Sequence, residues 1–370
     1  MSTRSNNFDV LRLAGALLVA VSHTFDVMLG SDPIAGMTGN QSLGGIGLNI
    51  FCVISGFLIT NSRMRNEPAA FFTSRALRIF PALLLAIPLM ALVLGPMVSD
   101  LKFTSYFSSP GMWHFLGTIF VFPLNPTLPG VFGGAPLVAQ LYSLTAELGF
   151  YVFVGLLGRW MHYGKLLAIL LALVFSVFIH FDYSTLSFSS LLSMQAGQMI
   201  LFTFPVRLGL ICVFYLLTGS AIALLAPNAK LLASCAPLFI VIWLIALFGH
   251  DRRVYDVTEM VLFPLTIIGI GVAQKIVIPV PKMLGDISYG IYIYHFAVAE
   301  LIRSWKIDAL QNGYLIALST VLSMLVAWIS FHVVEKRALS MKRTKSRSTA
   351  GNAFITDQAS IVRDDAHKPV

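Results

Sequence analysis

The sequence predicts an all-α fold, a polytopic bundle of about ten transmembrane helices with both termini in the cytoplasm. Of its 370 residues, 57% are hydrophobic and only 11% are charged, and the mean hydropathy is +0.81. Soluble proteins carry about 25% charged residues, so this chain has too few charges to cover a globule in water. Its apolar stretches are long and continuous, which excludes a β-barrel, because barrel strands alternate over about ten residues.

Charge and cysteine content exclude further classes of protein. The net charge of +8 comes from short basic runs between apolar segments, which are typical of topology signals rather than of a nucleic-acid surface. The three cysteines, Cys52, Cys212 and Cys235, are scattered inside apolar segments and predict no disulfide framework. We expect no metal site and no bound cofactor.

Apolar segments long enough to cross about 30 Å of hydrocarbon occur ten times. They lie near residues 8–30, 43–61, 78–98, 137–158, 165–181, 204–226, 231–249, 258–275, 286–304 and 313–334. Residues 112–124 are apolar but short, and they suit a re-entrant or interfacial piece better than an eleventh span. The first span is too long for a cleavable signal peptide, and Asp9 and Arg12 interrupt its start.

The distribution of Lys and Arg predicts the orientation. With the N-terminus in the cytoplasm, 19 of the 25 Lys and Arg residues lie inside and 6 lie outside, as the positive-inside rule requires. An even number of spans also places both termini on one side. We therefore predict a membrane domain over residues 1–337 and a polar, disordered cytoplasmic tail over residues 338–370.

Ionisable side chains inside a membrane are costly, so each is a candidate functional residue. In the first span, Arg12 and His23 are eleven residues apart, which places both on one helix face about 16 Å apart along the axis. Asp26 follows His23 at i+3 and can pair with it. A carboxylate-oriented imidazole is the arrangement that a general base needs. The alternative is that His23 makes a polar contact between helices.

Two arginines precede the third span. Arg75 and Arg78 are an i,i+3 pair and share one helical face. Two guanidinium groups placed in this way can clamp phosphates, because each offers a bidentate fork of donors. The alternative, which charge alone favours, is a plain positive-inside signal in a cytoplasmic loop.

Polar residues also occur inside spans two, four and nine. Glu147 lies near the middle of span four, and Tyr151 follows one turn later. Ser55 belongs to a stretch of small residues in span two, which favours close helix packing. Tyr289 and His295 lie in span nine, with His295 near mid-depth. Each is a candidate for lining a site within the membrane.

These segments together, in this order, resemble the acyltransferase-3 family of integral membrane acyltransferases. The stretch from Asp9 to His23 matches its Arg–ten residues–His signature, and Arg75 opens a match to its Arg-x-x-Arg-Ile-x-Pro segment. The other matching segments are Ser-Gly-Phe-Leu-Ile at 55–59, residues 127–132 and 141–151, and Ser-Tyr-x-x-Tyr-x-x-His at 288–295. The segments at 127–132 and 141–151 resemble members that O-acetylate exopolysaccharides and Nod factors.

The resemblance implies a multi-pass enzyme of the bacterial inner membrane that transfers an acyl group, most often acetyl, from cytoplasmic acyl-CoA to a sugar hydroxyl. The acceptor would be a surface polysaccharide or glycolipid precursor. His23 would deprotonate that hydroxyl or take the acyl group itself. The rival interpretation is a proton-coupled transporter or flippase, although no repeated halves are present. We expect His23, Asp26 and Glu147 to act in catalysis and Arg12, Arg75, Arg78, Ser55, Tyr151, Tyr289 and His295 to bind substrates.

Overall fold

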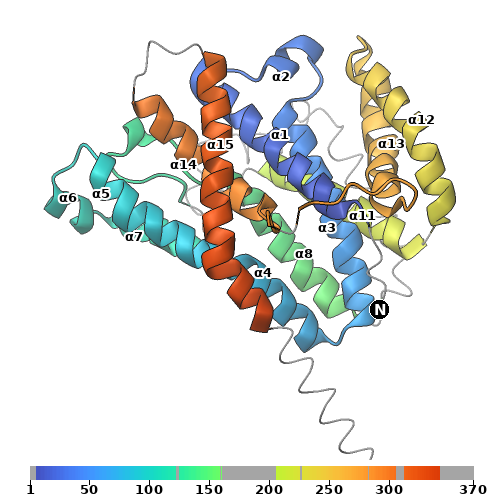
Figure 1. Ribbon diagram of the computed structural model, residues 1–370, viewed down its shortest axis with the longest axis horizontal. Helices are drawn as coiled ribbons and strands as arrows, with labels where there is room; N and C mark the ends of the chain where they lie inside the picture. Colours follow the sequence, from blue (N-terminus) through green and yellow to red (C-terminus); the bar gives the residue numbers. More distant parts are fainter. Residues whose placement is uncertain are drawn as a thin grey trace, which may run out of the picture.

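The computed structural model describes residues 6–121, 125–158, 160, 206–225, 227–281, 283–305 and 312–341, and this part of the chain forms a bundle of helices (Figure 1). The long helices are α1 (Phe8–Leu29), α3 (Leu43–Arg65), α4 (Pro68–Leu89), α8 (Tyr142–Leu157), α11 (Val206–Leu225), α12 (Ala229–Leu247), α13 (Arg252–Val272), α14 (Ser288–Ser304) and α15 (Asn312–Ser330). The short ones are α2 (Pro33–Thr38), α5 (Gly95–Val98), α6 (Phe103–Ser108) and α7 (Pro110–Gly117). Within the described residues, extended pairing is limited to one bridge, between Ser99 and Val131.

Eight helical runs in the described residues are long and apolar enough to cross a membrane. They confirm the all-α membrane fold and match eight of the ten predicted spans. The ninth span corresponds to α14, whose 17 residues are fewer than in any of the eight. The span predicted near 165–181 and the tail beyond 341 lie outside the described residues.

The third predicted span begins too late. It was expected near residue 78, but α4 begins at Pro68 and continues through a π-helical turn, Met90–Leu94, into α5. Pro68 stands at the first helical position, where its fixed φ favours a helix start. Arg75 and Arg78 therefore lie inside a helix rather than in a loop, and this fixes the direction in which both side chains point.

Helix α3 is central to the packing, and small residues allow its close contacts. A Cβ added to Gly47 would lie 2.4 Å from the carbonyl oxygen of Gly15 on α1. A Cβ added to Gly56 would lie 2.0 Å from the carbonyl oxygen of Leu216 on α11. Backbones approach this closely only where a side chain is absent. The glycines of span two thus have the packing role that the sequence favoured.

Contacts at the helix ends define two ends of the bundle. The Asn7 side chain, before α1, donates to the carbonyl of Ile270 near the end of α13. The Asn40 side chain, after α2, donates to the carbonyl of Leu247 at the end of α12. In Figure 1, α12 and α13 lie side by side at one edge of the bundle, and α5, α6 and α7 lie at the opposite edge. The residues discussed next lie between these edges.

Candidate functional site

Two histidines from different helices meet in the bundle. His23 lies on α1 and His295 lies on α14. Nδ1 of His23 is 2.7 Å from Nε2 of His295. The two rings are nearly parallel, 5.0 Å apart between centroids, and Phe296 stacks on His23 at 4.4 Å. His295 is completely buried. The structure therefore brings together two residues that the sequence placed in separate spans.

His23 does not use the partner that the sequence predicted. Asp26 is exposed, and the hydrogen bond of the His23 ring in the described structure goes to His295. The expected pairing with Asp26 does not form, although the same i,i+3 spacing joins Asp9 and Arg12, because the His23 ring turns toward α14 and Asp26 lies on the exposed side of α1. Here His23 points into the bundle and Asp26 points out of it.

Asp32, a carboxylate that was not predicted from the sequence, lies near His23 in the folded chain. Asp32 is buried, accepts a hydrogen bond from the hydroxyl of Ser22, and caps α2 through the backbone N–H groups of Ile34 and Ala35. The oxygen that accepts from Ser22 also accepts from the N–H of Leu43 at the start of α3. Asp32 thus joins three helices around His23. The Asp-Pro dipeptide that opens α2 is a helix-start signal and could have identified it.

Arginines gather at the end of the bundle where α1 begins. Arg12 lies 3.2 Å from the carboxylate of Asp9, and Arg78 lies 3.0 Å from that of Asp286, just before α14. Burial opposes ionisation of Asp286, but the positive charges of Arg78 and Arg12 hold the pKa of its carboxyl below the ordinary value. Asp286 was not predicted. Its role depends on residues more than 200 positions away, and no local pattern signals it.

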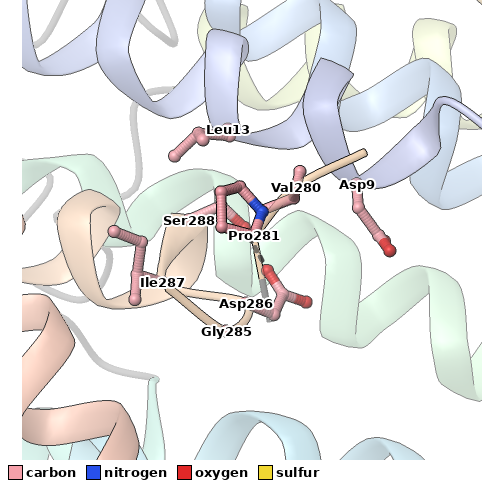
Figure 2. A pocket seen from close by; sticks show the side chains of 8 residues that line it. All are labelled: Asp9, Leu13, Val280, Pro281, Gly285, Asp286, Ile287 and Ser288. Atoms are coloured by element: carbon pink, nitrogen blue, oxygen red, sulfur yellow. Dashed lines mark hydrogen bonds between the residues drawn. The ribbon is translucent and has the colours of Figure 1, made fainter. Parts of the chain in front are cut away.

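A cavity of about 170 Å³ opens beside these ion pairs. Figure 2 shows Asp9 and Asp286 lining it together with Leu13 from α1 and residues of the segment 280–288. The hydroxyl of Ser288 donates to Asp286 at 2.6 Å and fixes the orientation of that carboxylate. The carboxylates of Asp9 and Asp286 therefore line the cavity, and each is paired with an arginine.

Arg75 has an environment unlike those of Arg12 and Arg78. Its guanidinium lies 5.7 Å from the ring centres of both Phe71 and Tyr151, a cation–π arrangement. Its Nε is buried and has no hydrogen-bond acceptor among the described residues. A buried donor without a partner is costly. The two rings thus hold Arg75 in place, and its Nε–H group remains able to donate a hydrogen bond.

A second, smaller cavity of about 50 Å³ brings three more predicted residues together. Ser55, Glu147 and Tyr289 line it from α3, α8 and α14. The hydroxyl of Tyr151 donates to Glu147 at 2.6 Å, and the hydroxyl of Tyr289 donates to the carbonyl of Ile79. Tyr151 connects this cavity to Arg75, because its ring faces that guanidinium. The predicted residues other than Asp26 thus fall into two groups. One is the histidine pair of His23 and His295. The other, called here the arginine–tyrosine–glutamate group, consists of Arg12, Arg75, Arg78, Ser55, Glu147, Tyr151 and Tyr289.

The start of α8 is locked to α14 by a group that sequence reasoning did not find. Gln140 donates through Nε2 to the backbone carbonyls of Tyr292 and Ile293, and the hydroxyl of Tyr292 donates back to the carbonyl of Gln140. Ser143 adds a 2.6 Å hydrogen bond to the Tyr292 hydroxyl. These bonds set the position of α14 one turn before His295.

Three known proteins are similar to this chain over most of its length. Nodulation protein 10 of Rhizobium leguminosarum bv. viciae is 30% identical over 362 residues, covering 92% of this chain and 95% of that protein. The O-acetyl transferase of Shigella phage Sf6 is 28% identical over 92% of this chain and 98% of its own length. The exopolysaccharide production protein ExoZ of Rhizobium meliloti (strain 1021) is 27% identical, with coverage of 85% and 96%. No solved structure matches the chain.

The family match extends over most of the described membrane region. The acyltransferase-3 family, described as an acyltransferase domain, matches residues 5–332, which include every residue of the histidine pair and of the arginine–tyrosine–glutamate group. The helices are those of a multi-pass membrane protein. The chain therefore belongs to the acyltransferase-3 family of membrane acyltransferases.

Proposed function

We propose that this protein is an O-acyltransferase of the inner, cytoplasmic membrane that moves an acetyl group from cytoplasmic acetyl-CoA to a sugar hydroxyl of a surface polysaccharide or glycolipid precursor. The observation that carries the proposal is the layout of α1. Arg12 lies at one end of this helix, in the cluster with Arg78, and His23 lies three turns further along, against His295. Anion-binding and proton-accepting groups are thus separated along one helix.

The arginine cluster suits the nucleotide part of acyl-CoA. Arg12, Arg75 and Arg78 provide guanidinium groups, which bind phosphate through paired donors. The unused Nε of Arg75 and the ion pairs of Arg12 and Arg78 offer contacts that phosphates can take over. The rise from Arg12 to His23 is about 16 Å, comparable to the length of an extended pantetheine arm. A thioester held in this way would reach the histidine pair.

The chemistry requires one proton acceptor next to the thioester. His23 takes the proton of the sugar hydroxyl, the sugar oxygen attacks the thioester carbonyl, and the carbon–sulfur bond breaks. The CoA thiolate that leaves then receives the proton. In the second route His23 attacks the thioester itself and passes the acyl group on to the sugar. Glu147 is hydrogen-bonded to Tyr151 beside Arg75. It would orient the acyl donor between the arginine cluster and the histidine pair.

The relatives support the substrate class. One is named as an O-acetyl transferase and another as an exopolysaccharide production protein. Both are covered almost completely by this chain, so the likeness concerns whole proteins rather than one shared segment. A hydroxyl of a polysaccharide repeat or of its lipid-linked precursor is the acceptor that these names suggest.

Mass spectrometry of surface glycans tests the proposal. Cells with and without this protein would be compared, alongside cells that produce the variant His23→Asn. We expect an acetyl group that is present with the intact protein and missing in the other two strains. Purified protein should in parallel release free CoA thiol from acetyl-CoA only when the acceptor glycan is added. An unchanged glycan in all three strains would contradict the proposed function.

A further inference from the structure

The hydrogen bonds of His295 determine which nitrogen of His23 is free. Nδ1 of His295 lies 3.2 Å from the backbone carbonyl oxygen of Ile291. A carbonyl oxygen can only accept, so this nitrogen carries the proton. A neutral imidazole has one N–H, and Nε2 of His295 is therefore an acceptor. The 2.7 Å contact must then be a hydrogen bond donated by Nδ1–H of His23.

The surroundings favour neutral rings. His295 is completely buried, and neither histidine ring hydrogen-bonds to a carboxylate within the part of the chain that the structure describes. A buried charge without such a partner is costly. One proton thus lies between the two rings, and Nε2 of His23 is left bare.

The bare nitrogen faces the first turn of α3. A Cβ added to Gly44 would lie 3.7 Å from Nε2 of His23 and 2.9 Å from the hydroxyl oxygen of Ser22, so the glycine leaves room for both side chains at this point of α3. Phe296 stacks on the imidazole of His23 and fixes the ring plane. The ring is therefore held by its face and by one nitrogen, and its other nitrogen lies against the start of α3, where Gly44 has no side chain.

We infer that His295 is a positioning residue, which holds His23 in the tautomer whose Nε2 accepts the proton of the sugar hydroxyl. The inference deepens the proposed function and rests on it for this last step. His295 keeps its own proton on Nδ1 throughout and makes no bond to the substrate. This role differs from the substrate-binding role that the sequence predicts for His295, and complete burial favours it, because a substrate has no surface of that ring to contact.

The tautomer is measurable without substrate. Protein labelled with ¹⁵N-histidine would be purified in detergent, and the His23 signals would be identified by their loss in His23→Asn. We expect a protonated Nδ1 and a bare Nε2 for His23 in the intact protein. Replacement His295→Met removes the acceptor and should give a mixture of both tautomers. A proton on Nε2 of His23 in the intact protein overturns the inference, whatever the enzyme does.

Kinetics then test the consequence. Loss of a correctly poised base costs about 10²-fold or more in rate, so His295→Met should lower kcat by that factor and leave KM for acetyl-CoA nearly unchanged. His295→Gln should keep kcat within about tenfold, because its side-chain carbonyl can accept from Nδ1–H of His23. Equal losses in the Met and Gln variants would point to packing alone and overturn the inference.

A matched control comes from the same kind of residue. His332 also places Nδ1 near the carbonyl four residues earlier, 3.0 Å from that of Trp328, but it has no histidine partner in the described structure. His332→Met should change neither kcat nor the His23 signals. The two measurements also separate the proposals. The expected tautomer in a protein without transfer activity would contradict the proposed function and leave the histidine geometry standing.

Discussion

His23 and His295 are 272 residues apart in the chain and share one proton between two ring nitrogens. Such a pair holds its rings in one orientation and one protonation pattern, because the hydrogen bond of each ring fixes the other. It also explains why a nearby carboxylate on the same helix is unnecessary. Asp26 is exposed, and Asp32, which is buried, reaches the region through Ser22.

The first prediction separates His23 from Asp26. His23→Ala should abolish acyl transfer while the protein still inserts at normal abundance, because we propose that His23 acts as a proton acceptor rather than as a packing group. Asp26→Asn should retain most of the activity, since its side chain points away from the ring. The measurement is release of CoA thiol by purified protein, with abundance read from membranes. Activity in His23→Ala would remove His23 from the mechanism.

The second prediction concerns the arginines of α4. Lysine keeps the charge but lacks the planar fork of donors. Loss of one charge-assisted contact costs about 1.5–3 kcal/mol, or roughly 10- to 100-fold in affinity. Arg75→Lys and Arg78→Lys should therefore weaken acetyl-CoA binding by that factor, measured by titration of purified protein.

Arg65 supplies the control for this comparison. It lies at the exposed end of α3, so Arg65→Lys should leave binding unchanged. If all three lysine variants bind acetyl-CoA as the intact protein does, the arginines of α4 serve topology only, and the donor site lies elsewhere.

Helix packing is sensitive to volume where α3 meets its neighbours. The third prediction uses two glycines inside helices. Gly47→Ala should lower the melting temperature, because the new methyl group meets backbone of α1 at 2.4 Å and overpacking of this kind costs about 1–3 kcal/mol. Gly149 in α8 has nothing within 4 Å of its Cβ position, so Gly149→Ala should be neutral or stabilising. Similar melting temperatures for both variants would show that α1 and α3 are not packed this closely.

Hydropathy was sufficient to predict most of the helices, because the membrane forces continuous apolar runs into helices. It failed at the start of α4, where Pro68–Arg78 carries polar residues and the helix begins before the apolar run. Glu147 and Tyr289 were identified as costly polar residues inside spans, and their shared cavity required the fold. Asp286 and Gln140 could not be predicted from the sequence, because their partners, Arg78 and the carbonyls of α14, are distant in the chain.

Across the whole molecule, the function depends on which end of the bundle faces the cytoplasm. α1 and α14 run in the same direction, since Arg12 and Asp286 lie at one end of the pair and the two histidines lie further along. α3 and α11 also run in parallel, because Thr60 near the end of α3 bonds to Ser220 in the second half of α11. These contacts fix which loops share a side, independently of any count of spans.

The last prediction combines this geometry with the positive-inside rule. Single cysteines would be placed at four exposed positions of the full-length protein whose three cysteines are replaced by serine, and an impermeant thiol reagent would be applied to intact cells. Ser31→Cys and Arg253→Cys should react, because Arg252 bonds to Asn40 and thus places both loops at one end. Glu67→Cys and Lys230→Cys, at the other end, should react only after the membrane is opened, since most basic residues lie there. Reaction at one member of a pair alone would contradict the helix arrangement. Reversal of all four would keep the arrangement and place the arginines outside, where cytoplasmic acetyl-CoA cannot reach them.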